Sequence, residues 1–235
     1  MKGLRRPLLL LAALLIAFFL IVFHAPLRAP LSVLSPQSAV EIRTARIQES
    51  TTTYSIDAQY PQFTISGGTV PQQGIDAVNA SIKAQVQKAV DDIKNYPANP
   101  PDMAMPQNAL TVTFDRVYVG PDYLSVELLI TEYTGGAHPN TLYDGLAYDR
   151  ATGRELSLDD ALSITGLSIG QLSAQASSTL AQHMGSDYIF PDGTAPDPAN
   201  FSSFVISSSS VTFIFQPYEV GPYSAGPQEV SVPRR

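Results

Sequence analysis

The sequence predicts an α+β fold in which antiparallel strand meanders pack with two amphipathic helices, preceded by one N-terminal transmembrane helix. Three observations lead to this prediction. Several short segments alternate apolar and polar residues, as half-buried strands do. Two longer segments repeat apolar residues every three or four positions, which is typical of amphipathic helices. An unbroken apolar run follows basic residues at the N-terminus. Antiparallel connections dominate, which favours α+β over a doubly wound sheet.

Residues 1–28 are predicted to form a signal-anchor or transmembrane segment. Lys2, Arg5 and Arg6 precede an apolar run over residues 7–23. A helix of that length reaches about 25 Å, near the lower limit for crossing a bilayer. Because basic residues stay inside, we expect a single-pass cell-membrane protein with its N-terminus inside and its body extracytoplasmic. The alternative is a cleaved signal peptide, which would leave a secreted protein.

The part after the anchor is expected to begin with a tether, a strand and a helix. Residues 29–48 are rich in Pro, Ser and Ala with weak periodicity, which favours a tether that holds the body off the membrane. Strand-like alternation starts near Tyr54 and is expected to end at Pro61. A helix is predicted after this strand, because apolar residues recur there at spacings of three and four. These residues are Ile75, Val78, Ile82, Val86, Val90 and Ile93.

An all-β stretch and a second helix complete the predicted body. Alternation predicts strands around residues 110–114, 124–130 and 142–148. Periodicity predicts the second helix over residues 169–184, with Ser168 as its N-cap. The last strands are expected over residues 204–206, 211–215 and 229–232.

Composition and charge exclude several classes of protein. The chain has no cysteine, which excludes a disulfide framework, a thiol nucleophile and cysteine zinc sites. Its three histidines leave little room for a histidine-rich metal site. After residue 28 the chain holds 10 Lys and Arg against 21 Asp and Glu, a formal charge of 10 − 21 = −11. This negative charge would repel the phosphate backbone of a nucleic acid, so we expect no nucleic-acid partner. The same charge would attract a basic partner.

The sequence contains no complete catalytic or metal-binding motif. Residues 221–226 resemble a nucleophile elbow, but Pro222 stands where the elbow needs its first glycine. Three aspartates, Asp187, Asp192 and Asp197, are five residues apart and do not match a calcium loop. We therefore expect a protein that is not an enzyme and that has no cofactor and no metal ion.

His138 is the histidine that the sequence singles out. It lies between two predicted strands, in the segment Tyr-Thr-Gly-Gly-Ala-His-Pro-Asn over residues 133–140. A histidine at this place could carry a proton or contact a ligand. Alternatively, its ring hydrogen-bonds the backbone of the turn. As a catalytic hypothesis, His138 would work with a nearby carboxylate such as Glu132 or Asp144.

Several segments together resemble a known family. They are residues 60–63 with the helix behind them, 133–140, 148–158 and 217–227. The chain resembles the paired extracytoplasmic domains of RsiV-type anti-sigma factors and the N-terminal region of PdaC-type peptidoglycan deacetylases. The similarity extends over Gln48–Pro233.

The resemblance implies two domains and a function in binding. A PdaC N-terminal-like domain is expected over residues 49–140, and an RsiV C-terminal-like domain over residues 141–235. Anti-sigma action is not expected, since only residues 1–6 precede the apolar run. Deacetylase action is not expected either, because three scattered histidines cannot rebuild that metal site. In RsiV-type proteins the module acts as a receptor for lysozyme.

We therefore expect a membrane-anchored, extracytoplasmic, non-catalytic binding or sensing module of the bacterial cell envelope. Its ligand would be a cell-wall glycan or a basic wall-active protein such as lysozyme. The alternatives are an envelope hydrolase acting on peptidoglycan and a structural accessory of another membrane protein. Tyrosine is common at recognition surfaces because it combines a broad ring with a polar tip. The candidate ligand-binding residues, whose alternative assignment is to the core or to turns, are Tyr133, Gly135, Gly136, His138, Tyr218 and Tyr223.

Overall fold

The computed structural model describes residues 40–67, 71–98 and 107–235. The predicted N-terminal anchor therefore lies outside the described residues. Within the described ranges, no helix is both long enough and apolar enough to cross a bilayer. The described residues form an α+β fold, as the sequence predicts, with two sheets and three α-helices. The prediction of two helices misses the short helix Leu158–Thr165, which buries only Ala161 and Thr165 and so shows little helical periodicity.

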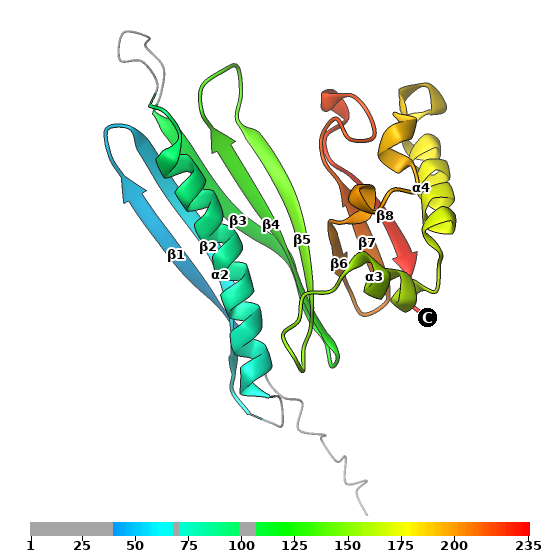
Figure 1. Ribbon diagram of the computed structural model, residues 1–235, viewed down its shortest axis with the longest axis horizontal. Coiled ribbons are helices and arrows are strands. Elements are labelled where there is room, and N and C mark those ends of the chain that lie inside the picture. Colours follow the sequence, from blue (N-terminus) through cyan, green and yellow to red (C-terminus); the bar gives the residue numbers. More distant parts are fainter. Residues whose placement is uncertain (1–39, 68–70, 99–106) are drawn as a thin grey trace, which may run out of the picture. The chain divides into compact units, whose positions relative to one another are not determined.

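A five-stranded sheet and one long helix form the first half of the body. The strands follow the order β1-β2-β3-β4-β5, and β2 and β3 are parallel while the other pairs are antiparallel. Helix α2 makes the crossover between the parallel strands and lies along the sheet (Figure 1). The elements are β1 Val40–Ser50, β2 Tyr54–Ile65, α2 Gln72–Asn95, β3 Asn108–Val119, β4 Tyr123–Tyr133 and β5 Asn140–Asp149.

The periodicity that predicts α2 also identifies the side chains that it buries. All six apolar residues of the pattern, Ile75 to Ile93, are at most 2% exposed. They pack on alternate residues of the sheet, including Ile56, Leu110 and Val126, in the first of two hydrophobic cores. The spacing of three and four residues places one apolar stripe on the sheet, which explains why this helix could be predicted from the sequence.

The predicted tether over residues 29–48 is wrong from Val40 onward. Residues 40–50 form strand β1, which pairs with β2 along its whole length. Only some residues of β1 are half-buried, and the rest are exposed. An edge strand of this kind shows little apolar alternation, and its charged residues, such as Arg43 and Arg46, help to prevent pairing with other chains.

The predicted end of the strand at Pro61 is also wrong, because β2 continues to Ile65. Strand β3 pairs with β2 only as far as Ala58, so beyond that residue one edge of β2 is open. The Asn79 side chain of α2 covers this edge: it accepts from Phe63 N–H and donates to Phe63 C=O, both at 2.8 Å. Pro61, two residues earlier, faces the same edge, where a missing N–H leaves the ladder with β1 intact.

A three-stranded sheet and two helices form the second half. Its strands are antiparallel in the order β6-β7-β8, and a second hydrophobic core lies between this sheet and the helices. Helix α4 begins at the predicted N-cap Ser168, and Ser168 and Gln171 form a reciprocal capping box. A similar box of Ser157 and Asp160 begins α3. The elements are α3 Leu158–Thr165, α4 Ile169–Met184, η1 Ser186–Tyr188, η2 Pro191–Thr194, η3 Pro198–Phe201, β6 Phe204–Ile206, β7 Ser210–Phe215, η4 Tyr223–Ala225 and β8 Gln228–Pro233.

Side chains bonded to main-chain groups join the two halves. Ser125 Oγ on β4 donates to Ile206 C=O at 2.7 Å and accepts from Ile206 N–H at 3.1 Å. Ser203 Oγ donates to Tyr143 C=O at 3.0 Å and accepts from Gly145 N–H at 2.9 Å. The Ser203 bonds satisfy backbone groups on the outer edge of β5, which would otherwise be open to pairing, and the Ser125 bonds satisfy those of Ile206 on β6.

Arg116 adds an ionic link across the same junction. Its guanidinium lies 3.0 Å from the Glu127 carboxylate on β4 and also pairs with Glu229 on β8. Glu127 is 4% exposed, and its burial raises the pKa of the carboxyl while Arg116 opposes that rise. One cation thus connects β3, β4 and β8.

Candidate functional site

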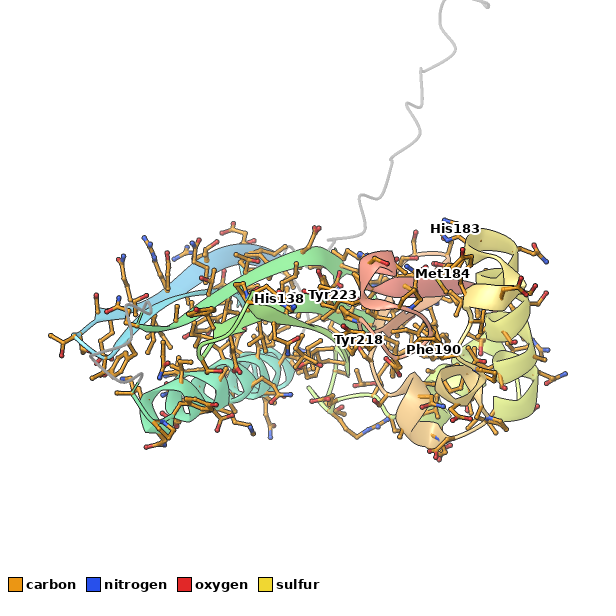
Figure 2. The ribbon with its side chains drawn as sticks, turned by 90° about the horizontal axis from the view of Figure 1, so that it is seen from above. His138, His183, Met184, Phe190, Tyr218 and Tyr223 are labelled. Carbon is orange, nitrogen blue, oxygen red and sulfur yellow. The ribbon has the colours of Figure 1, made fainter. Side chains whose placement is uncertain are left out.

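Three of the predicted site residues come together in a row of exposed rings. The His138 and Tyr223 rings are stacked, with centroids 4.7 Å apart and an interplanar angle of 22°. The Tyr218 and Tyr223 centroids are 5.2 Å apart. Tyr218 is 64% exposed and Tyr223 37%. Figure 2 shows the three side chains near one another, although they come from residues far apart in the sequence. We call His138, Tyr223 and Tyr218 the aromatic row.

The loop that carries Tyr218 is held by a tight turn over residues 216–219. Glu219 N–H donates to Gln216 C=O at 3.0 Å, and the Glu219 carboxylate accepts from Gln216 N–H at 2.6 Å. Pro217 at the second position and a φ of 72° at Tyr218 are features of a type II turn. A positive φ is strained for tyrosine, and strain of this kind concentrates at functional sites.

Gln216 ties this turn to the edge of β5. Its side-chain amide donates to Tyr143 C=O at 2.7 Å and accepts from Tyr143 N–H at 2.9 Å. The bonds resemble those of a further strand, supplied by one side chain. Because both ends of the amide are used, the position of the aromatic row is fixed relative to the sheet.

The His138 ring bonds the backbone of its turn and is also part of the aromatic row. Its Nδ1 lies 2.8 Å from Pro139 C=O and 3.2 Å from the Tyr223 hydroxyl. A carbonyl only accepts, so the shorter contact requires a proton on Nδ1. In that tautomer the other ring nitrogen, Nε2, is an acceptor, and no hydrogen bond to it is present among the described residues.

The structure places Tyr133, Gly135 and Gly136 in the turn before His138. The Tyr133 hydroxyl donates to Gly136 C=O at 3.2 Å. The φ angles of Gly135 and Gly136 are 99° and 112°, which explains why glycine occupies both positions. Within the described residues Tyr133 makes no ring contact with the aromatic row. These three residues shape the turn that presents His138.

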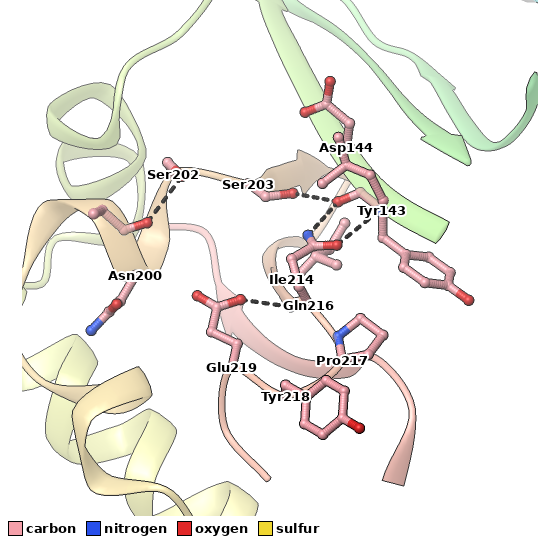
Figure 3. A pocket seen from close by; sticks show the side chains of 12 residues that line it. Tyr143, Asp144, Asn200, Ser202, Ser203, Ile214, Gln216, Pro217, Tyr218 and Glu219 are labelled. Carbon is pink, nitrogen blue, oxygen red and sulfur yellow. Dashed lines mark hydrogen bonds between the residues drawn. The ribbon is translucent and has the colours of Figure 1, made fainter. Parts of the chain in front are cut away.

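A pocket of about 520 Å³ opens beside Tyr218 (Figure 3). It lies where β5 meets the second half of the body, and its lining is mixed polar and apolar. The volume lies in the range of small-molecule sites. The lining residues are Leu142, Tyr143, Asp144, Ala199, Asn200, Ser202, Ser203, Ile214, Gln216, Pro217, Tyr218 and Glu219.

The two carboxylates at the pocket are oriented differently. Figure 3 shows the Glu219 carboxylate among the other lining side chains and the Asp144 carboxylate pointing away from them. Burial raises the pKa of Glu219. Asp144 accepts from Gln85 of α2 at 3.3 Å, and burial, assisted by the Glu155 charge, raises its pKa to about 6. Glu219 is therefore the carboxylate available to a molecule in the pocket.

The described residues do not bring His138 together with either carboxylate of the hydrolase hypothesis. Asp144 bonds Gln85, and Glu132 interacts with the charges of Asp92 and Lys88, so both acids face α2. The partners of the His138 ring are Pro139 and Tyr223. No cluster of His, Asp and Glu suited to a metal ion is present in the described part of the chain.

Glu219, Gln216 and Asn200 are site residues that sequence reasoning missed. Glu219 directly follows Tyr218 in a segment that the resemblance had already marked, so proximity was an available signal. Gln216 and Asn200 gave no such signal. Their role depends on how the second half packs on β5, which no local pattern encodes.

Two family models match consecutive parts of the chain. Residues 47–141 match the family described as Deacetylase PdaC. Residues 160–235 match the family described as Protein of unknown function (DUF3298).

Curated relatives match about half of the chain. The immunogenic protein MPT64 of Mycobacterium tuberculosis is 25% identical over 127 residues, which cover 54% of this chain and 56% of that protein. The peptidoglycan-N-acetylmuramic acid deacetylase PdaC of Bacillus subtilis is 27% identical over 129 residues, covering 54% of this chain and 28% of the relative. An esterase of M. tuberculosis is 29% identical over 110 residues, covering 47% and 48% of the two chains. The aligned regions thus span about half, or less, of each relative's own length.

Solved structures share the fold across most of the chain. A DUF3298 family protein from Bacteroides fragilis superimposes with a TM-score of 0.52 at 20% identity, covering 83% of this chain and 91% of that one. A DUF3298 family protein from Pseudomonas aeruginosa gives a TM-score of 0.51 at 18% identity, covering 83% and 90%. Residues 47–141 therefore belong to the PdaC domain family and residues 160–235 to the DUF3298 domain family.

Proposed function

We propose that this protein is a non-catalytic binding module of the bacterial cell envelope, and that it binds a cell-wall glycan on the aromatic row and in the adjoining pocket. The observation that carries the proposal is the row of exposed rings, with His138 stacked on Tyr223 and Tyr218 tilted against Tyr223, beside a pocket of about 520 Å³. Exposed apolar surface that is contiguous, in contrast to single scattered residues, marks interaction sites.

The chemistry of the site suits a sugar chain. Aromatic rings offer flat apolar faces on which the C–H face of a sugar can pack, while their polar tips hydrogen-bond. The pocket adds the amide oxygen of Asn200 and the hydroxyl oxygen of Ser202, which can accept from sugar hydroxyls. The donors of both side chains are bonded to main-chain carbonyls. A few oriented polar groups beside apolar surface are what ligand sites commonly present.

The family supports an envelope location. One relative is named as a peptidoglycan deacetylase, and the aligned region is 28% of its length, so the alignment transfers no activity to this chain. The apolar run over residues 7–23 would anchor the chain in the cell membrane and place the site outside.

A basic wall-active protein such as lysozyme is the second candidate ligand. The specific observation is the formal charge of −11 after residue 28. Such a surface accelerates association with a cationic partner and makes binding sensitive to salt. A glycan held by stacking and hydrogen bonds would bind with little dependence on salt.

A sedimentation experiment distinguishes these functions. The full-length chain in mild detergent is mixed with insoluble peptidoglycan, or with immobilised lysozyme, at low and high salt. We expect co-sedimentation with peptidoglycan that persists at high salt and is lost in Tyr223→Ala. Tyr96→Ala is the matched control, because Tyr96 is 50% exposed at the end of α2. If the chain binds only to immobilised lysozyme, and high salt abolishes that binding, the ligand is a basic protein and not a glycan.

Two further outcomes would overturn the proposal. Release of soluble wall fragments that stops in His138→Ala, with the fold unchanged, would make the protein a hydrolase. An absence of binding to either material would contradict both ligands and favour a structural accessory of another membrane protein.

A further inference from the structure

Among the described residues, the pocket beside the aromatic row is lined by negative side chains and by no positive one. Its charged lining residues are Asp144 and Glu219, and no Lys, Arg or His lines it in the described structure. Asp144 is engaged with Gln85 on the helix side. Glu219 is thus the one charged group that a ligand in this pocket would meet.

One oxygen of Glu219 has no protein donor. Its Oε2 accepts from Gln216 N–H at 2.6 Å, and Oε1 has no hydrogen bond within the described residues. The side chain is half-buried, so solvation of its charge is incomplete, and this burial raises the pKa of the carboxyl. A carboxylate in this state is stabilised by a cation that reaches its free oxygen.

From this we infer that the pocket binds the ammonium group of an amino sugar, so that the site prefers glycan units with a free amine to N-acetylated ones. The inference rests on the proposed glycan function and names the class of sugar. The Glu219 carboxylate accepts from the ammonium, and the neighbouring tyrosine rings bind the apolar face of the same sugar. The exposed face of Tyr218, on the turn that carries Glu219, can attract the same cation.

An N-acetylated unit would lack this interaction. Its amide nitrogen carries no charge, and it would leave the Glu219 carboxylate partly desolvated without a cation. The acid is charged only above its raised pKa, so binding of the amine should weaken as the pH falls through that range.

The test compares two probes of equal length on the purified full-length chain in mild detergent, a glucosamine tetramer and an N-acetylglucosamine tetramer. Isothermal titration calorimetry gives both affinities at neutral pH. We expect the glucosamine tetramer to bind about tenfold or more tightly, the ratio typical of one hydrogen bond to a charged group.

Glu219→Gln removes the charge and keeps the shape, and its amide oxygen can still accept from Gln216 N–H. We expect it to bind both tetramers with equal affinity. Glu41→Gln, an exposed carboxylate on β1, is the control and should keep the preference of the wild type. A thermal melt of each variant verifies that the fold is intact.

The outcomes separate this inference from the proposed function. Equal binding of both tetramers by the wild-type chain, or a preference that survives Glu219→Gln, would overturn the amine inference while leaving glycan binding in place. Failure of both tetramers to bind, together with failure to bind peptidoglycan, would overturn the proposed function itself. A lysine-rich peptide that displaces the glucosamine tetramer at lower concentration would assign the pocket to a protein ligand and refute the inference.

Discussion

Replacing Asp144 by Asn is expected to stabilise the protein at neutral pH and to have little effect at acidic pH. Burial and the Glu155 charge raise the Asp144 pKa from 3.8 to about 6 in the folded state. Between these values the folded state binds more protons than the unfolded state. Stability therefore falls as the pH rises through this window, and the full penalty is present above it.

The magnitude follows from the pKa shift. At about 1.4 kcal/mol per pKa unit, a rise from 3.8 to about 6 corresponds to about 3 kcal/mol at pH 7 or above. Asn keeps an oxygen that can accept from Gln85, so the bond to α2 survives. Because the variant carries no buried charge, its unfolding free energy at neutral pH should exceed that of the wild type by most of this amount.

Urea unfolding followed by circular dichroism measures the effect, since the chain has no tryptophan for fluorescence. The difference in unfolding free energy between variant and wild type should grow from near zero at pH 4 to about 3 kcal/mol at pH 7.5. Asp187→Asn, on the exposed η1 element, is the control for loss of charge. A difference that stays constant with pH, or a variant that is less stable at pH 7.5, would refute the reasoning.

Three further substitutions test the contact between the two halves, the bond of α2 to the edge of β2, and the aromatic row. Gly145→Ala should destabilise the chain by about 1–3 kcal/mol in urea unfolding, because its Cβ would lie 2.7 Å from Phe204 backbone atoms; a neutral effect would show that the two halves can separate there. Asn79→Ala should lower stability by about 2 kcal/mol through loss of the two bonds to Phe63, measured the same way, and an unchanged midpoint would contradict this. Tyr218→Gly should weaken glycan binding in calorimetry without lowering the melting temperature, because glycine adopts a positive φ freely; a lower melting temperature with intact binding would assign Tyr218 to structure.

The two longest helices, α2 and α4, were predictable from the sequence because their pattern is local. Apolar residues at helical spacing over residues 75–93 lie on the sheet, and the cap at Ser168 begins α4 where the hydroxyl suggested. Strand β1 was missed because an edge strand needs few buried residues, so its sequence looks like a tether. The continuation of β2 through Pro61 depends on a side chain of α2, which no window around the proline contains.

The candidate site was predictable only in part. The sequence marks His138, Tyr218 and Tyr223 as separate candidate binding residues, and the structure places their rings side by side. Tyr133 belongs to the turn instead. The pocket and Glu219 could not be predicted, since both arise where Gln216 and Ser203 bond the edge of β5 across a long sequence separation.

The most direct test of the central claim is an NMR titration of the chain labelled with carbon-13 in its tyrosine rings, with soluble cell-wall glycan as the ligand. Variants assign the signals of Tyr218, Tyr223 and Tyr96. If the aromatic row binds the glycan, the Tyr218 and Tyr223 signals shift in a saturable manner while the Tyr96 signal stays in place. Saturable shifts confined to other tyrosines, or no shifts at glycan concentrations at which the chain sediments with peptidoglycan, would contradict the proposed site.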